Sequence, residues 1–193
     1  MDEATLLQAI QNDPDNQAYT AQGIPPIYTL HSEAKIVIVG QAPGKKAQDT
    51  QLGWNDASGA RLRNWLGISR ETFYHSNKLA IVPMDFYYPG KARNGDLPPR
   101  QGFAAKWHPL CMALMPEVEL VLLVGQYAQA FYLADKPKTV TETVAQYHAY
   151  LPYYWPLPHP SPLNNRWLKQ NEWFEQEAVP HLQATVHHLL GSV

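Results

Sequence analysis

Short runs of consecutive apolar residues alternate along the chain with segments in which apolar residues recur every three or four positions. Three of the runs are rich in β-branched residues or leucine and end at a glycine or proline, at 35–40, 79–83 and 120–125. Such runs are typical of strands buried on both faces of a parallel sheet. An aromatic segment punctuated by proline, 151–157, predicts a last strand.

Helical patterns precede the first strand, at 4–10, and separate the others, at 59–66, 103–115 and 127–133. A closing helical region begins near Arg166, and we expect it to be broken or kinked near Pro180. Residues 84–99 are rich in proline and glycine and are expected to form an irregular loop. The alternation predicts an α/β protein with three α/β/α layers, a mostly parallel central sheet and a single domain over residues 1–193.

Composition narrows the partners and the chemistry. Fifteen Lys and Arg residues against seventeen Asp and Glu give a formal charge of −2, so any DNA contact must be local rather than a general electrostatic attraction. A lone cysteine, Cys111, permits neither an intramolecular disulfide nor a cysteine-ligated cluster. We expect a cytoplasmic monomer with no membrane segment, no metal and no cofactor, and surface positions for His181, His187 and His188.

Two unusual loops follow the first and last predicted strands. They are 40–44, which reads Gly-Gln-Ala-Pro-Gly, and 159–163, which reads His-Pro-Ser-Pro-Leu. Parallel sheets bind ligands beyond the carboxyl ends of their strands, which is where both loops are expected. Each loop alone is a weak signal, because tight turns favour Gly and Pro, and a histidine in such a loop is often structural.

Taken together and in this order, the two loops resemble the signature motifs of the uracil-DNA glycosylase superfamily. The likeness spans about residues 27–190 and extends to the segments 59–67, 74–77 and 123–128. The order of landmarks is similar to that of the iron–sulfur members. Those relatives use four cysteines, whereas this chain has only Cys111, so we expect their cluster to be absent.

The resemblance implies an enzyme that flips a damaged base out of DNA and cuts its N-glycosidic bond. His159, placed between two prolines, would stabilise the negative charge of the departing base. Ser161 would bind a DNA phosphate, and Leu163 would fill the gap that the flipped base leaves. Ordinary loop packing is the alternative for Leu163.

The resemblance also suggests residues that hold the base. Gly40, Ala42, Pro43 and Gly44 would line its site. Asn77 would read its edge through the side-chain amide, with a plain turn residue as the alternative. Trp54 or a neighbour would stack on its face.

The first loop departs from the family, because the best-known members carry a carboxylate at the position of Gln41 or Ala42. A neutral amide cannot accept a proton from water. In one interpretation Asp56 supplies the carboxylate, since Asp-Ala-Ser-Gly at 56–59 resembles an element of members with an apolar first motif. The alternative role of Asp56 is a helix N-cap.

Two other interpretations stay open. A slower glycosylase could rely on a water molecule held by Gln41. The fold could also serve as a catalytically weak or inactive module that binds nucleic acid without cutting it. The sequence thus predicts a monofunctional DNA glycosylase in base excision repair, acting on uracil or another deaminated base, with a nucleic-acid-binding module as the alternative.

Overall fold

The structure is a computed structural model, and it describes residues 1–191. At its centre lies a parallel sheet with the strand order β2-β1-β3-β4. The strands are β1 (Ile36–Val39), β2 (Leu79–Ile81), β3 (Leu120–Val124) and β4 (Tyr154–Leu157). The predicted α/β class with a parallel sheet is therefore confirmed. The last two residues of the predicted domain, 192 and 193, lie outside the described residues.

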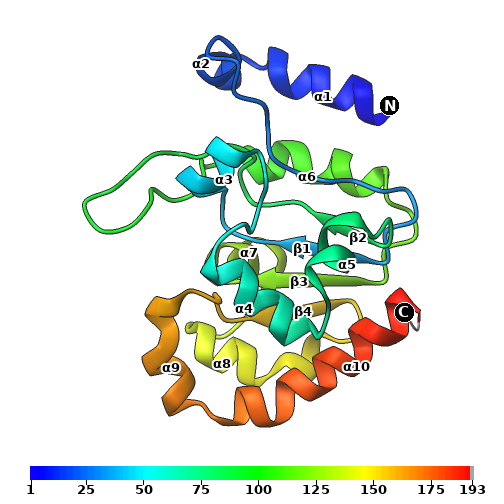
Figure 1. Ribbon diagram of the computed structural model, residues 1–193, viewed down its shortest axis with the longest axis vertical. Coiled ribbons are helices and arrows are strands. Elements are labelled where there is room, and N and C mark those ends of the chain that lie inside the picture. The colour runs from blue at the N-terminus through cyan, green and yellow to red at the C-terminus, as the bar shows by residue number, and fades with distance from the viewer. Residues whose placement is uncertain (192–193) are drawn as a thin grey trace.

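Helices cover both faces of the sheet (Figure 1). Successive strand residues point to opposite faces, so Ile36 and Ile38 enter one apolar core while Val37 and Val39 enter the other. One layer includes α4 (Ala57–Leu66), α8 (Val140–Ala145) and α10 (Val179–Leu190), and the other includes α1 (Glu3–Asn12) and α6 (Phe103–Ala113). Among the described residues, no helix has both the length and the apolar character needed to cross a bilayer.

The strands are shorter than their apolar runs, and the largest difference is in β4. Its pairing with β3 begins at Tyr154, opposite Val121, whereas the sequence predicts a start at residue 151. Residues Tyr147–Tyr150 form a 3-10 turn before it. Pro156 is accommodated within β4 because this strand lies at the edge of the sheet.

Three helices of six residues each were not expected from the sequence: α3 (Lys45–Thr50), α5 (Arg70–His75) and α8. A helix of this length makes less than two turns, so its apolar residues show no clear period. Two of these helices begin at a residue whose side chain caps the helix N-terminus. Ser69 caps α5, and Thr139 caps α8 in a reciprocal arrangement with Glu142.

The closing region is interrupted twice. The helix α9 (Asn165–Gln170) ends at Gln170, and a π-helical turn, Phe174–Ala178, lies directly before α10 and ends two residues from Pro180, near the predicted irregularity. Pro180 lies in the first turn of α10, where a missing backbone N–H costs no hydrogen bond within the helix. The remaining helices are α2 (Gln17–Thr20) and α7 (Gln126–Tyr132).

The long loop after β2 contains no regular strand or helix, as the sequence predicts. Its two ends are joined by a buried ion pair in which Arg100 donates from Nε and Nη2 to the Asp85 carboxylate, at 2.7 and 2.8 Å. Between them, Lys91 and Asp96 form an isolated antiparallel bridge. The loop projects from the body of the molecule beside α3 (Figure 1).

Candidate active site

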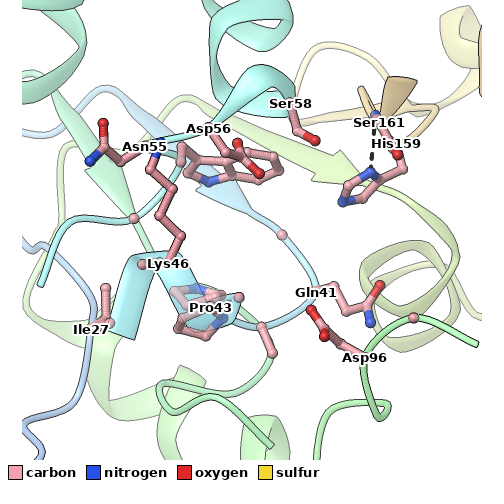
Figure 2. Close-up of a pocket in the computed structure, with 18 of the residues that line it drawn as sticks. Ile27, Gln41, Pro43, Lys46, Asn55, Asp56, Ser58, Asp96, His159 and Ser161 are labelled. Atoms are coloured by element: carbon pink, nitrogen blue, oxygen red, sulfur yellow. Dashed lines mark hydrogen bonds between the residues drawn. The ribbon is translucent and has the colours of Figure 1, made fainter. Parts of the chain in front are cut away.

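A cavity of about 470 Å³ opens beyond the carboxyl ends of β1 and β2. This volume is in the range of small-molecule sites. Residues from both signature loops and from the turn before α4 line the cavity (Figure 2). The sequence-predicted residues that come together here are Gly40, Gln41, Ala42, Pro43, Gly44, Trp54, Asp56, His159, Ser161 and Leu163.

The position of His159 is fixed by hydrogen bonds within its own loop. The backbone N–H of Ser161 donates to Nδ1 of His159 at 3.2 Å, and the side chain of Asn164 donates to the His159 carbonyl oxygen at 2.7 Å. Since Nδ1 accepts a hydrogen bond, the neutral ring carries its hydrogen on Nε2. That nitrogen points into the cavity (Figure 2).

The surroundings of His159 favour the neutral ring. Burial lowers the pKa of the imidazole below its usual value, and the Asp56 carboxylate opposes this shift in part. The ring therefore offers a neutral Nε2–H donor to a ligand near pH 7. A preorganised donor in a partly buried site is suited to stabilising negative charge that develops on a bound group.

Arg61 supports the loop from α4. It donates to the carbonyl oxygen of Ser161 at 3.1 Å and to the side-chain oxygen of Asn165 at 2.7 Å. The Ser161 hydroxyl accepts a hydrogen bond from the backbone N–H of Leu163 at 3.2 Å, so it caps a short 3-10 turn. The Leu163 side chain has 91% of its surface exposed at the edge of the cavity, which contradicts the alternative that it is packed within the loop.

Trp54 has an unusual backbone and a close neighbour. Its φ is +58°, a value that is rare for a bulky residue. Its indole lies so close to Gly40 that a Cβ at that glycine would be 2.6 Å from Cζ2. The indole and the His159 ring have centroids 5.9 Å apart. Trp54 thus packs on Gly40, lies near His159 and lines the cavity.

Asp56 is the N-cap of α4, as one of its two predicted roles requires. Its Oδ1 accepts a hydrogen bond from the backbone N–H of Gly59 at 2.8 Å. The residue also lines the cavity, and among the described residues no hydrogen bond to Oδ2 is found. The cap uses one oxygen and leaves the other for a ligand, so capping does not exclude a chemical role.

Gln41 follows β1, and its backbone is tied to the long loop by a hydrogen bond from the N–H of Asp85 to its carbonyl oxygen, at 3.2 Å. Asp96, on the long loop, also lines the cavity (Figure 2), and its Oδ2 would be 3.7 Å from a Cβ at Gly44. The hydroxyl of Tyr88 donates to Oδ1 of Asp96 at 3.2 Å. A second carboxylate thus borders the cavity.

Several polar residues of the cavity escaped sequence reasoning. Asp96 comes from the long loop at 84–99, which the sequence predicts to be irregular without singling out this residue. Lys46 lies on α3, one of the short helices without a visible period. Asn55, Ser58 and Asn164 also line the cavity, beside residues that were predicted.

Asn77 lies elsewhere. It precedes β2, so it lies at the amino ends of the strands, whereas the cavity opens beyond their carboxyl ends. Its exposed side chain donates a hydrogen bond to Glu33. The residues that β2 and its continuation bring to the cavity are Ile81 and Pro83, which have no side-chain amide.

Cys111 does not fit an iron–sulfur cluster. It is the only cysteine and is fully buried among apolar side chains between α1, α6 and the sheet. Burial raises the pKa of its thiol to about 12, which disfavours the thiolate that ligates iron. Over residues 1–191, no group of three or more His, Cys, Asp or Glu side chains could hold a metal ion.

A second hollow, of about 330 Å³, shares Gln41 and His159 with the first. It is also lined by residues that follow β3 and by α8 and α9, including Gly125 and Trp167. Trp167 is fixed there by a hydrogen bond from Nε1 to the Thr141 hydroxyl at 2.7 Å.

Comparison with known proteins agrees with this arrangement. The chain is similar in fold to the solution NMR structure of a candidate uracil DNA glycosylase from Methanosarcina acetivorans, with a TM-score of 0.51 and 14% sequence identity over 87% of this chain and 97% of that one. The model of the uracil DNA glycosylase superfamily matches residues 27–183. Since this match covers most of the sequence, the chain belongs to the uracil DNA glycosylase superfamily.

Proposed function

We propose that the protein is a monofunctional DNA glycosylase that flips uracil or another deaminated base into the cavity and hydrolyses its N-glycosidic bond. The observation that carries the proposal is the neutral His159, whose Nε2–H faces a cavity that Asp56 and Trp54 also line. Superfamily membership supports DNA as the substrate.

The leaving-group side of the reaction belongs to His159. When the bond between C1′ and the base nitrogen breaks, its electron pair departs with the base and negative charge builds on a carbonyl oxygen. A hydrogen bond from Nε2–H stabilises that oxygen. The indole of Trp54 contacts the face of the base, and the exposed Leu163 occupies the space that the base leaves in the DNA.

The sugar side belongs to Asp56. The sugar becomes positively charged as the bond breaks, and a carboxylate stabilises this charge and accepts a proton from the water that adds to C1′. The free Oδ2 of Asp56 is available for this step. Gln41 orients the water through its amide but cannot take the proton.

The test is a direct assay with the full chain. DNA strands containing uracil, hypoxanthine or xanthine, single and double, are incubated with excess protein and then treated with alkali, which cuts at abasic sites. We expect cleavage with the wild type, a large loss with His159→Ala and with Asp56→Asn, and full activity with the exposed control His188→Ala. If the protein binds the DNA but produces no abasic sites, the proposed enzyme activity is wrong and the protein is a nucleic-acid-binding module.

The variants also separate the two possible sources of the sugar-side function. A fully active Asp56→Asn protein would remove that carboxylate from the mechanism. In that case Gln41→Ala should abolish the activity, because the water would then depend on the Gln41 amide alone.

A further inference from the structure

The turn that carries Trp54 and Asp56 is held by a set of hydrogen bonds from two helices. The hydroxyl of Tyr74 donates to the carbonyl oxygen of Gly53 at 2.9 Å. Arg63 donates from Nη1 to the carbonyl oxygen of Trp54 at 3.2 Å, and Arg70 donates to Oδ1 of Asn55 at 3.0 Å. With the capping bond of Asp56, four consecutive residues, 53–56, are each anchored.

Two of the anchoring side chains, Arg63 and Arg70, both contact the third, Tyr74. Arg63 donates to the Tyr74 hydroxyl at 3.4 Å, and the guanidinium carbons of Arg63 and Arg70 lie 5.7 and 4.9 Å from the centre of the Tyr74 ring. Partial burial raises the pKa of the Tyr74 hydroxyl, which keeps it protonated and able to donate. Tyr74 is thus at the centre of the group.

The backbone of Trp54 explains why such a group is needed. A bulky residue at φ +58° is strained, and strain of this kind persists only where the surroundings fix the conformation. The space for it is also prepared, because a Cβ at Gly59 would lie 1.7 Å from the Trp54 carbonyl oxygen. The carbonyl oxygen held by Arg63 is the same atom that a side chain at position 59 would displace.

We infer that Arg63, Arg70 and Tyr74 are positioning residues of the active site, which set the places of the Trp54 indole and the Asp56 carboxylate relative to His159. The inference rests on the proposed function, since it assigns these residues a part in the same reaction. None of the three lines the cavity, so they act through residues 53–56 rather than on the DNA. Their effect should therefore fall on the rate of bond cleavage rather than on DNA affinity.

Tyr74→Phe is the sharpest test, because it removes the shared hydroxyl and keeps the ring. The control is Tyr147→Phe, a buried tyrosine whose hydroxyl forms a hydrogen bond with Nδ1 of His181 in a different part of the core. In single-turnover assays we expect the rate of base release to fall about ten- to a hundredfold for Tyr74→Phe, as expected for misplaced catalytic groups. The affinity for DNA with a stable abasic-site analogue should be unchanged, and the control should react at the wild-type rate.

A second measurement does not depend on catalysis. The fluorescence of Trp54 is obtained by subtracting the emission of Trp54→Phe from that of the matching protein with Trp54, and its quenching by acrylamide reports how firmly the indole is held. We expect stronger quenching in Tyr74→Phe than in the wild type or in Tyr147→Phe.

The outcomes distinguish the two proposals. Wild-type protein without base release contradicts the proposed function, whereas the quenching experiment still decides whether the turn is held by Tyr74. A Tyr74→Phe protein with wild-type release and wild-type quenching overturns the inference. Loss of DNA affinity in proportion to the loss of rate would also overturn it, since the residues would then serve binding and not positioning.

Discussion

Replacing Gly40 by alanine should disable the site while leaving the fold largely intact. The new Cβ would lie 2.6 Å from Cζ2 of Trp54. Ordinary van der Waals contact begins at 3.4 Å, so the indole edge must move by about 0.8 Å. The backbone of Gly40 does not have the positive φ that excludes alanine, so the effect comes from this contact alone. Overpacking of this size costs about 1–3 kcal/mol of stability.

The functional effect should exceed the effect on stability. A displacement near 1 Å from the productive geometry can reduce a rate by roughly a hundredfold. The measurement is single-turnover release of uracil by Gly40→Ala, together with its thermal unfolding. Gly44→Ala is the matched control from the same loop, because its Cβ would meet only Oδ2 of Asp96 at 3.7 Å, an ordinary contact.

A double mutant shows whether the indole is the cause. In the Trp54→Phe background the smaller ring leaves room for the Cβ at position 40, so adding Gly40→Ala should cost little further rate. The two substitutions would then be strongly non-additive. Base release is expected to require that the Trp54 indole lies over Gly40. Full activity of Gly40→Ala, or additive losses of rate in the double mutant, would refute this requirement.

Four further predictions concern charge and exposed groups. Protonation of His159 should stop the reaction in acid, because the protonated ring cannot accept the hydrogen bond to Nδ1. Since the pKa of His159 is lowered, the rate should not change with pH until the pH is below 6.5. A rate that rises in acid would contradict this prediction. His108 has its pKa lowered to about 4 by burial, so its unfolded form binds more protons than its folded form between pH 6.5 and 4. This group alone should lower the stability by roughly 3 kcal/mol as the pH decreases through that interval, and His108→Leu should remove that part of the slope. Leu163→Ala should lower base release from duplex DNA roughly tenfold without changing the melting temperature, because the side chain is 91% exposed. Arg93→Ala in the projecting loop should reduce the slope of log affinity for DNA against log salt concentration by about one unit. Lys35→Ala, before β1 at the amino ends of the strands, should leave this slope unchanged.

The sheet could be predicted because burial on both faces leaves a continuous apolar run. The run before Gly40 supplies Val37 and Val39 to one core and Ile36 and Ile38 to the other, and no polar residue interrupts it. Short helices such as α5 leave no comparable trace, since their packing is decided by residues far away in sequence. The motif loops were located correctly for the same reason as the strands, because they are the direct continuations of β1 and β4.

The contents of the site were less accessible to sequence reasoning. The contact between Trp54 and Gly40 depends on a left-handed backbone at Trp54, which the chain adopts only with support from α4 and α5. The side-chain amide of Asn77 matched a motif, yet its place before β2 puts it at the amino ends of the strands. The predicted strand at 79–83 also begins after Asn77, so the strand boundary itself argued against the motif match, because ligands bind at the carboxyl ends of parallel strands.

The neutral Gln41 becomes understandable when the charges around the cavity are considered together. Gln41 lines the cavity together with the Asp96 carboxylate, so a carboxylate at position 41 would add a further negative charge to the same cavity, which favours the uptake of a proton by one of the two groups. Asp56 lies at the N-terminus of α4, where the helix dipole favours negative charge, and it has an oxygen left over from its capping bond. A chain that brings Asp96 to this cavity therefore has a physical reason to place the catalytic carboxylate on the turn before α4. On this reasoning, the absence of a carboxylate from the first loop is compatible with catalysis.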